Sequence, residues 1–213
     1  MSVTADAPPA LTQVAQRYRA TSRGVVGFRM QRTFDVHAGF RRRHEELTME
    51  GVYDNGTIVK VRVLNYTIDG KPASASDRSS MEQDWTHPQP GNAFAPPFDP
   101  RNFGSYSYRS AGAQTIAFTS SVNDRGHGSG TFTYDGAGNV VAYTYHPNVL
   151  PPHAKSGEID DRRAQVLLGY WAVTQESHQY SGSYAIFAGS GTVTIRYSGF
   201  RRFPSLQSAL SAM

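Results

Sequence analysis

The chain has 213 residues, a formal net charge of +4, 38% hydrophobic and 18% charged residues, and no cysteine. This composition excludes a disordered or fibrous protein, a disulfide framework and the usual cysteine-rich zinc sites. The length fits one large domain, and no segment approaches the ~18 consecutive apolar residues of a membrane-spanning helix.

The first residues predict a leader followed by a helix. Residues 1–9 have the composition of a short disordered leader, of the kind left when a start methionine replaces an export signal. Over residues 10–20, apolar side chains recur at the spacing of one helical stripe: Leu11, Val14, Ala15 and Tyr18. We therefore expect one amphipathic helix here, bounded by Pro9 and Gly24.

After Gly24 the apolar period changes from helical to alternating. Phe28, Met30, Phe34 and Val36 share one face of a strand. Asn55-Gly56 favours a type I′ hairpin turn, and Asp69-Gly70 marks a second turn. The pattern predicts consecutive hairpins, hence an antiparallel meander.

The basic residues in this region do not form a nucleic-acid-binding pattern. The run of Arg41, Arg42 and Arg43 is followed directly by Glu45 and Glu46. A nucleic-acid surface would gather positive charge in a stripe interleaved with aromatic residues. We expect no nucleic-acid partner, and at most a weak attraction of this run to anionic lipid.

Residues 85–104 interrupt the strands with five of the twelve prolines of the chain. Proline is not tolerated in a central strand. The same segment holds Trp85, Phe94, Phe98 and Phe103, and exposing so much ring surface to water is unfavourable. We predict a lid or plug lying across the sheet; a rigid connector with its own small apolar cluster is the alternative.

Strands resume at residue 106. A hairpin is predicted around the turn 135–139, and residues 146–163 are expected to be irregular. Three closing strands are expected, at 164–175, 179–188 and 192–203, before a C-terminal tail at 204–213. Residues 10–203 should therefore form a single β-rich domain of mainly β (α+β) class. We expect a curved antiparallel sheet or half-barrel with an N-terminal helix and irregular lid loops.

The titratable residues show no catalytic or metal-binding motif. The seven histidines are scattered, without an i, i+4 pair or the H-E-x-x-H signature. Residues 126–130, GHGSG, lack the order of a nucleophile elbow and are interpreted as a turn. Asp160 and Asp161 are neighbours on a strand and should face opposite sides. We expect no catalytic residue, no metal and no cofactor.

The abundance of apolar and aromatic strand residues indicates a binding face. One helix cannot cover both faces of a sheet, so the uncovered apolar face must be closed by curvature, loops, a partner or a ligand. A pocket between a sheet and its lid is a natural apolar binding site. The residues expected to line it, with Trp85 and Phe98 in the lid, are Phe28, Met30, Trp85, Phe94, Phe98, Tyr143, Trp171 and Phe187.

The order of these elements resembles a known superfamily. An N-terminal helix, a strand beginning VVGFRMQRTFDV, a meander, the hairpin GTFTYDGAGNVVAYTY and the closing strand TIRYSGFRRF resemble the LolA/LolB-like lipoprotein carriers. The likeness covers most of residues 10–203. It implies an incurved half-barrel with a plugged mouth and an apolar cavity for acyl chains, in a periplasmic or otherwise extracytoplasmic protein.

These observations lead to one preferred function and two alternatives. The preferred hypothesis is an exported carrier or sensor that binds a lipid or lipoprotein acyl chain, with a membrane or lipoprotein as partner. The first alternative is a structural or protein-interaction domain that buries its aromatic sheet face against a partner. The second is an enzyme of an unrecognised β fold, with His127 as its candidate residue.

Overall fold

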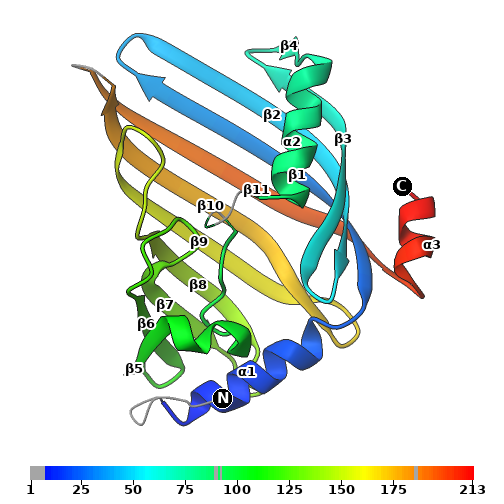
Figure 1. The fold of residues 1–213 in the computed structure, drawn as a ribbon, viewed down its shortest axis with the longest axis vertical. Helices are drawn as coiled ribbons and strands as arrows, with labels where there is room; N and C mark the ends of the chain where they lie inside the picture. Colours follow the sequence, from blue (N-terminus) through cyan, green and yellow to red (C-terminus); the bar gives the residue numbers. More distant parts are fainter. Residues whose placement is uncertain (1–7, 89–90, 92, 185–186) are drawn as a thin grey trace.

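The computed structural model describes residues 8–88, 91, 93–184 and 187–213, which form one eleven-stranded antiparallel sheet and four short helices (Figure 1). The helices are α1 (Ala10–Thr21), α2 (Ala75–Thr86), the 3-10 helix η1 (Pro100–Ser105) and α3 (Leu206–Ser211). The strands are β1 (Val25–Ala38), β2 (Arg41–Asp54), β3 (Thr57–Ile68), β4 (Lys71–Pro72), β5 (Tyr106–Gly112), β6 (Thr115–Ser120), β7 (Gly128–Tyr134), β8 (Val140–Pro147), β9 (Ala154–Leu167), β10 (Tyr170–Tyr184) and β11 (Phe187–Phe203). The expected curved sheet with an N-terminal helix is confirmed.

The strand order places the two ends of the chain at the middle of the sheet and leaves its two edges apart. The order is β4-β3-β2-β1-β11-β10-β9-β8-β7-β6-β5, so the first and last long strands pair in the middle, from Val25 with Phe203 to Ala38 with Gly189. The edge strands β4 and β5 do not close the sheet, which remains an open half-barrel (Figure 1).

A crossover between the two edges covers the concave face. The chain leaves β4 at one edge and must reach β5 at the opposite edge, and it does so through α2 and the segment that follows it (Figure 1). We name residues 93–105 the lid segment. Of the lid expected at 85–104, residues 85–86 end α2, residues 89–90 and 92 lie outside the described residues, and the rest from residue 93 on crosses the sheet as an irregular stretch followed by η1. The strand order requires such a crossing, because β4 and β5 lie at opposite edges.

Two apolar clusters lie beneath this crossover. Under α2, the partly buried Met81 and Trp85 pack against a buried cluster on β1, β2, β3 and β11. Under the lid segment, Phe98 packs with Leu11 and Val14 of α1 against strands β5 to β8. The apolar stripe expected on α1 is confirmed, because Leu11, Val14 and Ala15 are all buried.

Helix α2 was not expected, and Trp85 lies at its end rather than in a loop. Its sequence has no apolar stripe and none of its residues is fully buried, so periodicity does not reveal it. The signal is instead a capping box, in which the Ser74 side chain accepts from the Asp77 amide while the Asp77 carboxylate accepts from the Ser74 amide.

The strand limits expected for the last third of the chain were wrong. β9 already begins at Ala154, inside the stretch expected to be irregular, and a turn at Gly169 (φ +69°) divides the expected strand 164–175. Residues 189–191 are not a break but lie inside β11. A Cβ at Gly189 would lie 2.9 Å from the His37 carbonyl oxygen, so this glycine permits close strand packing. The expected strand 179–188 passes through residues 185–186, which lie outside the described residues.

The expected turns in the first half are confirmed. Asn55 and Gly56 have φ angles of 49° and 81°, and Asp69 and Gly70 have φ angles of 51° and 75°. These are the left-handed values that a two-residue type I′ connection requires.

Candidate functional site

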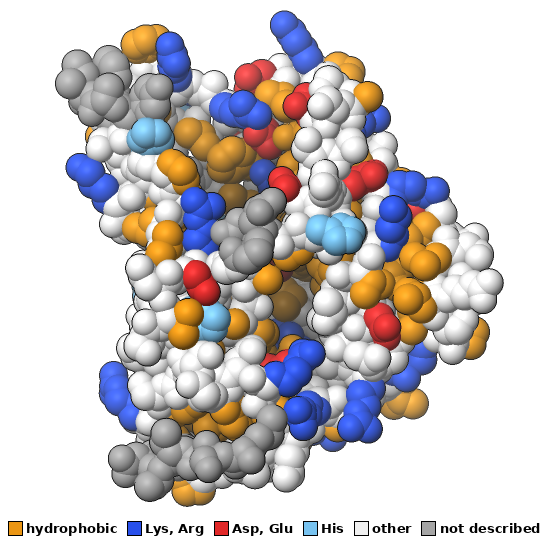
Figure 2. Space-filling view, viewed as in Figure 1, with side chains coloured by type: hydrophobic (Ala, Val, Ile, Leu, Met, Phe, Trp, Pro, Cys, Tyr) orange, Lys and Arg blue, Asp and Glu red, His pale blue; other side chains and the backbone are white. Residues whose placement is uncertain are grey.

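A cavity of about 700 Å³ lies between the concave face of the sheet, the end of α2, the lid segment and the end of α1. It lies between the apolar cluster under α2 and the apolar cluster under the lid segment, and side chains of both clusters line it. Figure 2 shows this face of the molecule hollowed, with hydrophobic side chains at the bottom of the hollow. A pocket between the sheet and its lid was one of the ways expected for closing the apolar face, and the cavity lies in that position.

Five of the eight residues expected to line a pocket line this cavity: Trp85, Phe94, Phe98, Tyr143 and Trp171. They come from α2, the lid segment, β8 and β10, so strands and crossover contribute together. Trp85 and Trp171 are the two tryptophans of the chain.

The other three expected residues lie elsewhere. Phe28 is buried behind the cavity, where its ring contacts Tyr53 and Tyr197, and it also borders a smaller cavity of about 330 Å³. Met30 is fully buried in the cluster under α2. The side chain of Phe187 lies outside what the structure describes.

Ring contacts and hydrogen bonds attach the lid segment to α1 and to the strands beneath it. Phe98 is 1% exposed, and its ring centroid lies 5.0 Å from that of Tyr18 and 5.3 Å from that of Tyr143. The Tyr106 and Tyr108 hydroxyls donate to the carbonyl oxygens of Ala95 and Pro97, both at 2.6 Å. These contacts hold the segment in place over β5 to β8.

Polar groups gather on one side of the cavity, in a row across three strands. Tyr143 on β8 pairs with Asp161 on β9, which in turn pairs with Glu176 on β10. The Tyr197 hydroxyl donates to Glu176 Oε1 at 2.6 Å, and His178 Nε2 lies 3.2 Å from Glu176 Oε2. We name Asp161, Glu176 and His178 the polar floor.

The polar floor cannot be recognised from neighbouring residues in the sequence. Along the strand the carboxyl group nearest to Asp161 is that of Asp160, and adjacent strand residues face opposite sides of the sheet. The partner of Asp161 is Glu176 on the next strand, and this register follows from the turn at Gly169, which was not predicted. Placing that turn would have aligned the two carboxyl groups.

Burial controls the ionisation of this region. Burial, and then the nearby Glu176 carboxylate, raise the pKa of Asp161, whereas the Tyr143 hydroxyl lowers it. Burial also raises the pKa of Tyr143 and Tyr197 well above the usual tyrosine value, so both hydroxyls remain protonated donors.

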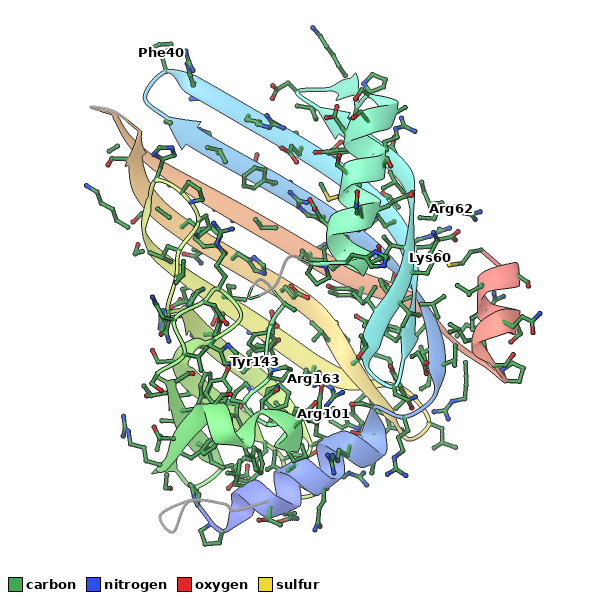
Figure 3. The ribbon with its side chains drawn as sticks, in the orientation of Figure 1. Phe40, Lys60, Arg62, Arg101, Tyr143 and Arg163 are labelled. Carbon is green, nitrogen blue, oxygen red and sulfur yellow. The ribbon has the colours of Figure 1, made fainter. Side chains whose placement is uncertain are left out.

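An arginine borders the same space from β9. The Arg163 guanidinium lies 5.1 Å from the Tyr18 ring centroid and 5.7 Å from that of Phe98, and it donates to the Trp171 carbonyl oxygen at 3.1 Å. Figure 3 shows Arg163, Arg101 and Tyr143 close together above α1. The cavity therefore combines ring surfaces with a few oriented polar groups, as small-molecule sites do.

No family model and no curated protein matches this sequence, but solved structures with a similar fold are found. A DUF1329 family protein from Desulfovibrio piger aligns with a TM-score of 0.45 at 9% identity, over 94% of each chain. A LolA superfamily protein from Nitrosomonas europaea aligns with a TM-score of 0.41 at 9% identity, over 96% of this chain and 97% of that chain. A lipovitellin structure aligns with a TM-score of 0.44 at 10% identity, over 87% of this chain and 26% of that chain. All three TM-scores lie below 0.5 and all three identities are 10% or less, so the likeness is to the course of the chain alone.

Among the described residues, no helix has both the length and the apolar character needed to span a membrane.

Proposed function

We propose that this protein is an extracytoplasmic carrier or sensor that holds a lipid or lipoprotein acyl chain in the cavity between its sheet and its crossover. The supporting observation is the cavity of about 700 Å³, lined by aromatic rings from both the strands and the crossover. Its volume lies within the range of roughly 300–1,000 Å³ typical of ligand pockets.

Apolar burial provides the driving force for such binding. Each CH₂ group transferred from water contributes about 0.8 kcal/mol, so an acyl chain needs no elaborate polar site. A carrier is useful where an acyl chain must cross water between two membranes, so a membrane or lipoprotein partner is part of the proposal. The extracytoplasmic location is also part of the proposal. No catalytic step is part of it.

The alternative, a partner burying the aromatic sheet face, has less support. In the described part of the chain, α2 and the lid segment already cover the concave face. The exposed large hydrophobic residues of the described part are few and lie in four different places: Val59 and Leu64 on β3, Phe40 in the turn after β1, Leu168 in the turn after β9, and Leu210 on α3.

The two tryptophans allow a direct test. A brominated fatty acid quenches indole fluorescence on contact, and both Trp85 and Trp171 line the cavity. We expect saturable quenching in the full chain and in each of the variants Trp85→Phe and Trp171→Phe. Across a series of chain lengths, the affinity should rise about fourfold per CH₂ until the cavity is full.

A cavity-filling variant and a matched surface variant separate this site from nonspecific binding. Val173 lines the cavity, whereas Val59 on β3 is 36% exposed. Val173→Phe should weaken binding at least tenfold, and Val59→Phe should leave it unchanged. Absence of saturable quenching in the unmodified protein, or equal effects of the two variants, would rule out the proposal.

A further inference from the structure

The buried carboxyl groups of the described residues differ in whether an arginine forms an ion pair with them. Among the described residues, Glu45, Asp99 and Asp161 are the buried carboxylates. Glu45 forms ion pairs with Arg32 at 3.4 Å and Arg43 at 2.6 Å, and Asp99 pairs with Arg101 at 2.5 Å.

Asp161 lacks this compensation, although it is only 4% exposed. Its Oδ1 atom has no hydrogen-bond partner among the described residues. The charged group directly across from it, on β10, is another carboxylate, Glu176. Burying a carboxylate without a counter-charge is costly, so this arrangement points to a missing positive partner.

The neighbouring arginine is already engaged. Arg163 follows Asp161 by two residues and lowers its pKa, but its guanidinium faces the rings of Tyr18 and Phe98 and donates to the Trp171 carbonyl oxygen. The missing partner is therefore best supplied from outside the chain.

The polar floor has the geometry of a ligand set. Glu176 and His178 are two residues apart on β10 and so share a face, and Asp161 lies beside Glu176 on β9. One ligand atom from each of the three lies within 4.8 Å of the others, and Glu176 Oε2 lies 3.2 Å from His178 Nε2. Metal–ligand bonds of about 2.0–2.2 Å place two ligands of one ion roughly 3–4 Å apart, so small side-chain rotations complete the set.

We infer that Asp161, Glu176 and His178 form a binding site for one divalent transition-metal ion, Zn²⁺ or Mn²⁺, at the side of the cavity. One imidazole nitrogen with two carboxylate oxygens suits such an ion better than Mg²⁺ or Ca²⁺, which prefer oxygen ligands alone. The ion neutralises both carboxylates and is bound by the Asp161 Oδ1 atom, which otherwise has no partner among the described residues.

Surrounding hydroxyl groups support this ligand set. The Tyr197 hydroxyl holds Glu176 Oε1 at 2.6 Å, and the Tyr143 hydroxyl interacts with the Asp161 carboxyl group. Donors of this kind orient the ligands of a metal. The inference depends on these side chains and not on what the cavity carries.

Calorimetric titration of the chelator-treated full chain with Zn²⁺ and with Mn²⁺ tests the site. We expect saturable binding of one equivalent of at least one of the two ions. Asp161→Asn, Glu176→Gln and His178→Ala should each weaken it at least tenfold. Glu176 and His178 are only partly buried, so substitutions there are expected to leave the protein folded. These two variants therefore test the site even if Asp161→Asn does not fold.

A second histidine–carboxylate pair provides the matched control. His44 Nδ1 lies 2.7 Å from Asp35 and its Nε2 lies 3.7 Å from Glu46, in an exposed setting on β2. His44→Ala should leave the titration unchanged. Binding of Co²⁺ should also give visible absorption bands that disappear in His178→Ala. No saturable binding of either ion, or unweakened binding in the folded polar-floor variants, would overturn the inference.

Discussion

Individual carboxyl groups show how the surroundings of a side chain decide its effect on stability. Asp99 and Asp161 are both almost fully buried, at 1% and 4% exposure. Asp99 accepts from Arg101 and also caps η1 by accepting from the Arg101 amide at 2.9 Å. Asp161 instead faces Glu176, so only one of these two carboxyl groups should stabilise the metal-free fold.

Substitution of each by asparagine makes this difference measurable. Asp161 must take up a proton on folding near neutral pH, because burial and Glu176 raise its pKa to about 8. Asp161→Asn removes this cost and should raise the free energy of unfolding of the metal-free protein by about 1–2 kcal/mol. Asp99→Asn removes the ion pair with Arg101, whose own side chain is 64% exposed and stays solvated, and should lower the free energy of unfolding by about 1–2 kcal/mol. Urea unfolding followed by tryptophan fluorescence gives both values, and a loss of stability in Asp161→Asn would contradict the prediction.

The two parts of the crossover differ at the scale of the element. The lid segment is packed into a core cluster through Phe98, whereas α2 has no fully buried residue. α2 is held by the packing of Met81 and Trp85 and by the Glu82 carboxylate, which accepts from the Val63 amide at 2.7 Å. Elements with few buried contacts open locally at low free-energy cost, so α2 is the part of the cover that should open first.

The capping box of α2 allows this opening to be tuned. Ser74→Ala removes the side-chain acceptor for the Asp77 amide and should destabilise the helix by about 1 kcal/mol. Hydrogen exchange of the α2 amides should accelerate about fivefold, while exchange in β7 and β8 stays unchanged. Ser205→Ala removes the equivalent capping box of α3 and should not affect α2. Unaltered α2 exchange in Ser74→Ala would contradict this account.

The whole molecule depends on pairing between the two ends of the chain. β1 and β11 are neighbours in the sheet although more than a hundred residues separate them, and the cluster under α2 includes Val193, Ile195 and Tyr197 of β11. Such long-range pairing makes slow folding expected, because the loop-closure entropy must be lost before the contacts form.

Two truncations test this dependence. A chain ending at residue 186 lacks β11, which leaves β1 and β10 without their shared partner, and it should show no cooperative urea transition. A chain ending at residue 203 keeps all eleven strands and loses α3, whose Ala209 is buried, so it should unfold cooperatively with about 1–3 kcal/mol less stability. A cooperative transition in the shorter chain would show that pairing with β11 is not needed for cooperative folding.

The parts of the structure that were predictable follow from interactions between near neighbours. Asn55-Gly56 and Asp69-Gly70 specify their turns because left-handed backbone angles are a local property of those residues. Alternation along β1 and the stripe on α1 likewise depend only on the geometry of one element. Phe94 and Phe98 could be expected off the sheet because the prolines exclude their segment from a strand, whereas Trp85 reaches the cavity from α2, which no periodicity indicates.

Residue patterns alone indicate an antiparallel sheet of hairpins, with more apolar surface than the one expected helix covers. Only the folded chain shows that β1 pairs with β11, that the crossover between the two edges passes over the concave face, and that Asp161 meets Glu176 and His178. The physical reason is that turn and strand preferences act over a few residues. The register between β9 and β10, and the strand at each edge, arise only when distant segments share one core.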